Sequence, residues 1–129
     1  MKIPKQKSIN QLVADLDKVF SIFIRTRDIN EEGYSFCVTC GKPMTLKTSQ
    51  CGHFRSRTKY ATRWEEKNCA AQCVGCNIFK EGMHYEFGCA IDKKYGAGTA
   101  EMLRIKSQNT FDKNRTVLNL LINHYKNKI

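Results

Sequence analysis

The sequence lacks any long apolar run and any hydrophobic leader. No stretch approaches the roughly 20 consecutive apolar residues that a bilayer-spanning helix requires. The first residues, MKIPKQKSINQ, carry charge without the apolar core of a secretory signal. These two absences argue against a membrane-spanning or secreted protein, so we expect a cytoplasmic one.

Internal repeats, low-complexity tracts and long linkers are also lacking in this chain of 129 residues. A chain of this length favours one domain with one modest core. We therefore expect residues 1–129 to form a single domain. It would comprise an N-terminal helix over 8–27, a central segment over 35–84 and C-terminal helices over 84–129.

Acidic residues are scarce relative to basic ones, with 12 Asp and Glu against 22 Lys and Arg, for a formal net charge of +10. Because each neutralised phosphate releases counterions, such an excess attracts polyanions. Nucleic acid is the partner that this charge favours, and a solvated basic surface that aids solubility is the alternative. A membrane partner is not expected.

Large aliphatic residues are few between residues 30 and 80 and concentrate in the flanking segments. Ser8 and Gln11 form a capping-box pattern, and apolar residues at spacings of three and four follow up to Arg27. This periodicity predicts an amphipathic helix that supplies core. Later helices are predicted over 84–95 (ended by Gly96), 99–107 and from 112 or 113 to 126, the last with Val117, Leu120, Leu121 and His124 on one face.

The central segment reads as turns and short extended pieces. Short strands are predicted over 50–55 and 69–72, residues 59–63 look like loop, and a helix should follow Cys73 through Lys80. So little regular structure and so few aliphatic residues leave hydrophobic burial thin here. Another source of folding free energy is therefore expected.

Seven cysteines, an odd number in a chain without an export signal, argue against a disulfide framework. Cys37-x-x-Cys40 and Cys73-x-x-Cys76 each place two thiolates on one tight turn, and two such turns complete a tetrahedral Zn²⁺ site. A redox dithiol would need a thioredoxin-like βαβ pattern, which is lacking; uncoordinated buried thiols are the other alternative. Structural zinc would stabilise the middle of the chain. Cys51, Cys69 and Cys89 remain, with packing favoured for Cys51 and Cys69 over ligation.

Between the two cysteine pairs lie Gly52-His53-Phe54 and then Asn68, and Asn77 directly follows Cys76. This order resembles the HNH branch of the ββα-metal (His-Me finger) nucleases. Over nearly the whole chain the sequence also resembles the phage recombination proteins called NinG or Rap. That wider resemblance rests on Ser21-Ile-Phe-Ile-Arg25-x-Arg27-Asp28, Cys37-x-Thr-Cys40-Gly41, Cys51-Gly-His53-Phe54, Arg63-Trp-Glu65-x-x-Asn68, Gln72-Cys-x-x-Cys76-Asn77, Gly82 and Tyr95-Gly96.

The resemblance implies an α+β fold with a zinc-bound ββα-metal (HNH-like) core between flanking helices. It also implies a bacteriophage protein, in the host cell cytoplasm, that acts as a structure-selective DNA endonuclease on branched recombination intermediates such as D-loops and Holliday junctions. Symmetrical cleavage of a four-way junction would suit a homodimer, although no interface is legible in the sequence. Phage recombination proteins are further candidate partners.

Three residues are expected to carry the hydrolysis. A histidine pKa near 6.5 lets His53 accept a proton from water, Asn68 would brace the loop and orient the imidazole, and the Asn77 amide oxygen suits Mg²⁺ or Mn²⁺. The alternatives are a structural histidine or zinc ligand at 53, a turn residue at 68 and a helix cap at 77.

One position departs from the HNH pattern. Many HNH nucleases place Asp or another ligand immediately before the catalytic histidine, where this chain has Gly52. The second ligand of the catalytic cation must then come from elsewhere, or His53 must itself touch the cation. Glu81, one helical turn after Asn77, and Glu65 are the candidates, with His84 a weaker one.

Basic residues follow His53 directly. Arg55, Arg57, Lys59 and Arg63 are the predicted DNA contacts, which would hold the scissile phosphate near the base. Tyr60 and Trp64, interleaved among them, would stack on unpaired bases, although Trp64 fits the core equally well. Two alternatives to a nuclease remain: a non-catalytic zinc-dependent DNA-binding module, and a zinc-stabilised adaptor for a recombination or replication protein.

Overall fold

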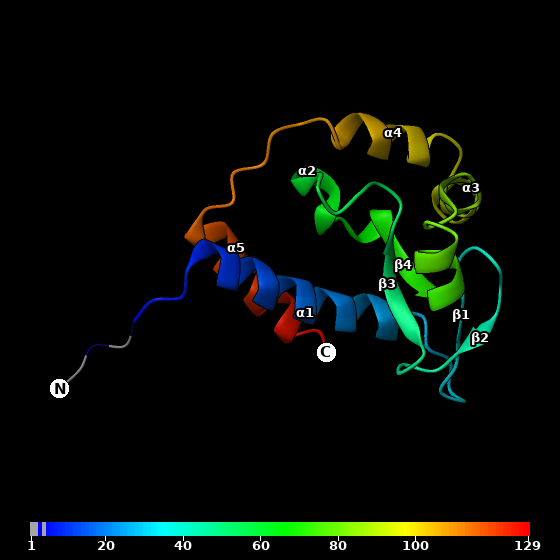
Figure 1. Cartoon of the computed structure of the whole chain (residues 1–129), viewed down its shortest axis with the longest axis horizontal. Helices are drawn as coiled ribbons and strands as arrows, with labels where there is room; N and C mark the ends of the chain where they lie inside the picture. Colours follow the sequence, from blue (N-terminus) through cyan, green and yellow to red (C-terminus); the bar gives the residue numbers. More distant parts are fainter. Residues whose placement is uncertain (1–2, 4) are drawn as a thin grey trace.

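The computed structural model describes residue 3 and residues 5–129, which form helices around two small antiparallel sheets (Figure 1). The α+β class predicted from the sequence is confirmed. The elements in chain order are α1 (Ile9–Arg27), β1 (Ser35–Phe36), β2 (Pro43–Met44), β3 (Ser49–His53), α2 (Tyr60–Arg63), the 3-10 helix η1 (Glu66–Asn68), β4 (Cys69–Cys73), the π-helix η2 (Gly75–Phe79), α3 (His84–Tyr95), α4 (Thr99–Lys106) and α5 (Arg115–Lys126).

The N-terminal helix α1 begins as predicted. The Ser8 hydroxyl accepts a hydrogen bond from the Gln11 backbone N–H at 3.1 Å, and the Gln11 side chain accepts one from the Ser8 N–H at 2.8 Å. These bonds satisfy two backbone donors at the start of the helix. Its buried residues, Leu12, Val13, Leu16, Phe20 and Ile24, form the centre of the main core.

Helices α1 and α5 lie side by side (Figure 1). The face of α5 differs from the predicted one: Leu118, Ile122 and Tyr125 are buried, whereas Leu120 is 65% exposed and His124 is exposed. Tyr125 explains which face of α5 is buried. Its ring packs edge-on against Phe20 at 5.0 Å, and its hydroxyl donates to Glu66 at 3.1 Å. A large ring with a partner for its hydroxyl is favoured inside.

The β3–β4 hairpin carries the central segment. The strands pair antiparallel from Ser49 opposite Cys73 to His53 opposite Cys69, close to the predicted strands. Residues 59–63, expected to be loop, instead contain the single helical turn α2. The predicted helix after Cys73 forms as a π-helix, in which the Lys80 N–H donates to the Gly75 carbonyl at 2.9 Å.

The helices α3 and α4 follow the predicted bounds within one residue. Gly96, with φ of +112°, ends α3 in a conformation that glycine adopts without strain. Within residues 3 and 5–129, no helix combines the length and apolar character needed to cross a membrane.

Candidate functional site

Four cysteines converge at the junction of the two sheets. Cys37 follows β1, Cys40 lies on the turn between β1 and β2, Cys73 ends β4 and Cys76 lies in η2. Their sulfur atoms all lie within 4.8 Å of one another, and the Cys40 and Cys73 sulfurs are 3.7 Å apart. A tetrahedral ion with Zn–S bonds of about 2.3 Å separates its sulfurs by about 3.8 Å. The predicted cysteine cluster is therefore confirmed as a group that could hold a structural metal such as Zn²⁺.

Backbone hydrogen bonds to sulfur prepare this cluster for a cation. The Cys73 N–H donates to the Cys37 sulfur at 3.3 Å, and the Cys76 N–H donates to the Cys73 sulfur at 3.4 Å. Burial opposes ionisation of Cys37, but the hydrogen bonds from Cys73 and Thr39 outweigh it and lower its pKa to about 6. A bound cation would favour the thiolate form of the other three as well.

A pocket of about 280 Å³ lies between α1, β3 and η2. Its lining comprises Asp17, Lys18, Phe20, Ser21, Gln50, Cys51, His53, Arg57 and Asn77. Two of the three predicted catalytic residues, His53 and Asn77, therefore face one cavity. His53 reaches it from the end of β3, and Asn77 reaches it from η2.

The imidazole of His53 has a defined hydrogen bond. Its Nε2 lies 3.0 Å from the Arg63 carbonyl oxygen, which can only accept, so Nε2 carries the proton and Nδ1 the lone pair. Burial lowers the pKa of His53 below its usual 6.5, a shift that the Arg63 carbonyl opposes. The ring is therefore neutral near pH 7, with one nitrogen able to accept a proton.

Asn68 is fully buried and holds the loop that follows His53. Its amide oxygen accepts from the Arg55 N–H at 2.8 Å, and its Nδ2 donates to the carbonyls of Arg55 at 3.2 Å and Thr62 at 2.9 Å. These are backbone hydrogen bonds of the kind predicted for a bracing role. Asn68 itself does not line the pocket, so its influence on His53 passes through the backbone.

Asn77 is oriented by a neighbour that the sequence did not single out. Its Nδ2 donates to Gln50 Oε1 at 2.8 Å, which fixes the amide and leaves its oxygen as the group for a cation. Glu81 is exposed with φ of +54° and does not line the pocket. Glu65 pairs with Lys106 at 2.5 Å, and His84 Nδ1 bonds the Phe54 carbonyl at 2.8 Å. None of these three candidate ligands shares the cavity.

Close packing against Gln72 explains why position 52, where many HNH nucleases have a metal ligand, is a glycine in this chain. A Cβ at this position would meet Gln72 Oε1 at 2.3 Å and Gln72 Cβ at 3.0 Å. Gln72 is itself fully buried, and its Nε2 donates to Thr39 at 3.1 Å and to the Gly82 carbonyl at 2.9 Å. It thus ties the first cysteine turn to the segment after η2, and a carboxylate at position 52 would displace it.

Asp17 on α1 is the residue that the sequence analysis missed. Its carboxylate accepts from Arg63 Nε at 3.0 Å and Nη2 at 2.6 Å, from Arg57 Nη2 at 3.1 Å and from Trp64 Nε1 at 2.9 Å. Burial raises its pKa, but the hydrogen bonds and charge of Arg63 outweigh this and lower it. Asp17 therefore fixes Arg63, whose carbonyl in turn holds His53. In the sequence, this role is indicated by an acidic residue at the polar edge of an otherwise apolar helix face.

The predicted DNA contacts separate into two groups. The Arg63 side chain is 11% exposed and engaged with Asp17, and Trp64 lies in the core, so both serve the internal structure. Arg57 keeps 60% of its side chain exposed at the pocket mouth, and Lys59 is exposed on the same loop. Arg55 is half-buried, with Nε 3.3 Å from the Ser107 hydroxyl.

Replacing Asp17 with Asn should destabilise the fold, because it removes the charge from a half-buried ion pair and leaves Arg63 without its partner. We expect a loss of about 2 kcal/mol in the free energy of unfolding, measured by denaturant titration. Asp15→Asn on the same helix is the matched control: Asp15 has an exposed bond to Lys7 and should change stability little. Equal effects of the two substitutions would contradict the role given to Asp17.

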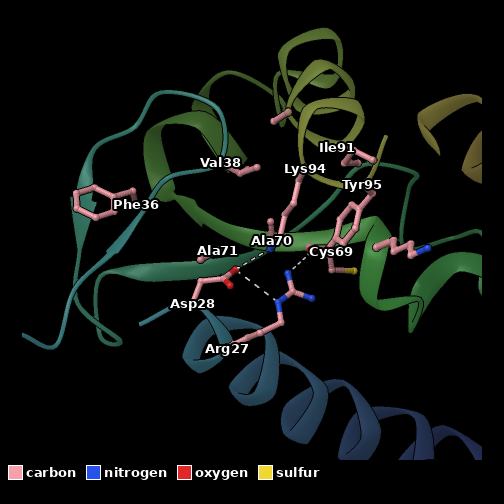
Figure 2. Close-up of a pocket in the computed structure, with 12 residues that line it drawn as sticks. Arg27, Asp28, Phe36, Val38, Cys69, Ala70, Ala71, Ile91, Lys94 and Tyr95 are labelled. Carbon is pink, nitrogen blue, oxygen red and sulfur yellow. Dashed lines mark hydrogen bonds and ion pairs between the residues drawn. The ribbon is translucent and has the colours of Figure 1, made fainter. Parts of the chain in front are cut away.

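A second cavity, of about 100 Å³, lies beside β4 (Figure 2). Arg27 and Asp28 from the end of α1 and Lys94 and Tyr95 from α3 surround it. The Asp28 carboxylate lies 3.5 Å from Arg27 and 3.3 Å from Lys94, and Arg27 Nη2 donates to the Cys69 carbonyl at 2.9 Å. Asp28 thus pairs with a cation from each side of the cavity, which joins α1 to α3.

Comparison with known proteins identifies the family. The model of one family, described as Bacteriophage Lambda NinG protein, matches residues 1–129. The chain belongs to the NinG family. No curated protein and no solved structure matches it. The NinG part of the resemblance drawn from the motifs is therefore confirmed, and it supports a role related to phage recombination.

Proposed function

We propose that this NinG-family protein is a metal-dependent endonuclease of the HNH type, as the Rap resemblance implies, that hydrolyses phosphodiester bonds in branched DNA. D-loops and Holliday junctions formed during phage recombination are the proposed substrates. The observation that carries this proposal is the shared pocket of His53 and Asn77 beside the four-cysteine cluster.

His53 is assigned as the general base. Its Nε2 is held by the Arg63 carbonyl and its pKa is lowered by burial, so the neutral ring offers Nδ1 to a water molecule. The proton passes from that water to Nδ1 as the hydroxide attacks phosphorus. Asn68 and Asp17 are positioning residues, because each acts on the loop or the carbonyl that holds the ring.

The pocket fits a hard divalent cation that keeps most of its own water. It offers the Asn77 amide oxygen as a ligand and leaves His53 Nδ1 free to act as the base, whereas the Asp17 carboxylate already accepts four hydrogen bonds. Mg²⁺ binds through few protein ligands together with substrate phosphates. When bound, Mg²⁺ or Mn²⁺ would supply positive charge for the phosphate and its leaving oxygen.

DNA is proposed to enter along the exposed cations at the pocket mouth. Arg57 and Lys18 line the pocket and Lys59 follows on the same loop, within a chain of net charge +10. Contacts of this kind bind phosphates without reading sequence, so selectivity would rest on the shape of the DNA. A homodimer bound across a four-way junction would present two pockets.

One domain is also proposed. The main core combines α1 and α5 residues with Trp64 and Cys69 from the central segment. This shared core would make the terminal helices and the metal-binding middle unfold together.

The test is cleavage of linear, flapped, D-loop and four-way DNA by the full chain with Mg²⁺ or Mn²⁺, with a chelator as the blank. Cleavage at branches that is lost in His53→Ala supports the proposal. Salt-sensitive binding without cleavage of any substrate would instead indicate a DNA-binding module. A pull-down of recombination proteins that persists without DNA and in high salt would indicate an adaptor.

Cleavage should fall in acid with a midpoint below pH 6.5. Neutral His53 is the active form, and burial lowers its pKa, so the neutral form persists to a lower pH than for a free histidine. The measurement is kcat/KM for branched DNA between about pH 5 and 8, with circular dichroism at each pH to separate titration from unfolding. A midpoint above 7 in folded protein would contradict the assignment of His53.

A further inference from the structure

A second group of metal-binding side chains lies on the β3–β4 hairpin, apart from the four-cysteine cluster. One ligand atom from each of Cys51, His53 and Cys69 lies within 4.8 Å of the other two. His53 is paired with Cys69 and Cys51 with Ala71, so all three side chains project from one face of the hairpin. The Arg63 carbonyl oxygen is near two of them, 3.0 Å from His53 Nε2 and 3.8 Å from the Cys69 sulfur.

Two thiolates and one imidazole are a donor set that Zn²⁺ accepts with a fourth position left for water or substrate. Tetrahedral coordination requires separations of about 3.5 to 3.8 Å, so the three atoms, now within 4.8 Å of one another, need to approach by at most about 1.3 Å. Cys51 and His53 line the pocket and Cys69 is buried behind them. The open position would therefore face the cavity rather than the core.

We propose that Cys51, His53 and Cys69 form a second site for a thiophilic divalent metal such as Zn²⁺, and that filling it inhibits the nuclease. The first part stands on geometry alone, and the second rests on the proposed function of His53. A neutral imidazole has one lone pair, so a ring that coordinates a metal cannot accept a proton from water. Binding would convert two thiols to thiolates and release two protons to solvent.

The hard cation proposed for catalysis and the thiophilic cation proposed here have different preferences. Mg²⁺ selects oxygen ligands and gains little from thiolates, whereas Zn²⁺ favours sulfur and nitrogen. The same pocket would thus respond in opposite ways to the two metals. Magnesium would support cleavage, and zinc in excess of the four-cysteine cluster would stop it.

Metal stoichiometry provides the test, with Co²⁺ as the spectroscopic probe for the reduced full chain. We expect the wild-type chain to bind about two equivalents of Co²⁺, with the absorption band of thiolate-to-cobalt charge transfer. The Cys51→Ser and His53→Gln variants should each bind about one equivalent. Cys89→Ser is the control, since Cys89 is an exposed thiol on α3, and it should keep both equivalents. Circular dichroism checks that each variant is folded.

One equivalent in the wild type, or two equivalents retained in both site variants, would overturn the proposed site. A Cys51–Cys69 disulfide in place of the second equivalent would overturn it as well. If branched DNA is cleaved, Zn²⁺ beyond the first equivalent should lower the wild-type rate at least about tenfold and leave the Cys51→Ser rate at its own zinc-free value. Absence of any cleavage would refute the proposed nuclease, while the cobalt stoichiometry would still decide the metal site.

Discussion

Removing the ion from the four-cysteine cluster, by chelation or by Cys40→Ser, is expected to unfold the central segment from β1 to η2, together with the terminal helices that share a core with it. The apolar residues packed around the cluster are few: Met44 and Ala71, with Met83 partly buried beside them. A structural zinc contributes free energy on the order of 10 kcal/mol in small modules, comparable to the whole stability of a typical domain of about 5 to 15 kcal/mol. Thermal unfolding followed by circular dichroism, with metal content by mass spectrometry, measures the effect.

Cys40 is the informative position because it is exposed and is not one of the buried residues of the core around the cluster. A loss of stability in Cys40→Ser therefore reports the metal rather than a cavity. Cys89→Ser, another exposed thiol but outside the cluster, should unfold as the wild type does. Unchanged melting on chelation, together with zero zinc in the purified protein, would refute a structural metal.

Replacing His53 with Ala is expected to lower the cleavage rate by about 10²- to 10⁴-fold, the contribution usual for a general base. Binding of branched DNA should persist, because the exposed cations of the pocket mouth remain. His124→Ala is the matched control, since His124 is exposed on α5 and outside the pocket. We would measure single-turnover cleavage and DNA affinity for both variants.

A loss of binding equal to the loss of cleavage would show that His53 acts by holding the loop rather than by accepting a proton. Arg57→Ala distinguishes the two roles further. Arg57 is 60% exposed, so its removal should weaken binding and reduce its salt dependence while the cleavage rate of bound DNA changes less.

Features set by nearby residues in the chain could be predicted from the sequence. The capping box of α1, the two cysteine turns and the glycine end of α3 each depend on residues a few positions apart, and each forms as expected. Their spacing alone determines their geometry.

Features set by contacts between distant segments could not be predicted in this way. The face of α5 depends on Tyr125 reaching Glu66, and Asp17 meets Arg63 across 46 positions of the chain. Arg63 and Arg57 look alike in the sequence, yet one is held inside by Asp17 and the other stays exposed. Gln50 and Gln72 gain their roles only when the hairpin brings them to Asn77 and Gly82.

The hydrogen bonds of Asn68 close the base of the loop between β3 and β4, and the Asp17 carboxylate anchors Arg57 and Arg63 within that loop. A change of loop length near Lys59 would therefore be transmitted to the Arg63 carbonyl that holds His53, whereas substitution of exposed side chains such as Lys59 would leave that contact in place. Under the proposed function, related proteins would acquire different junction preferences by exchanging those exposed side chains, while Asp17, Arg63 and Asn68 keep the loop in place.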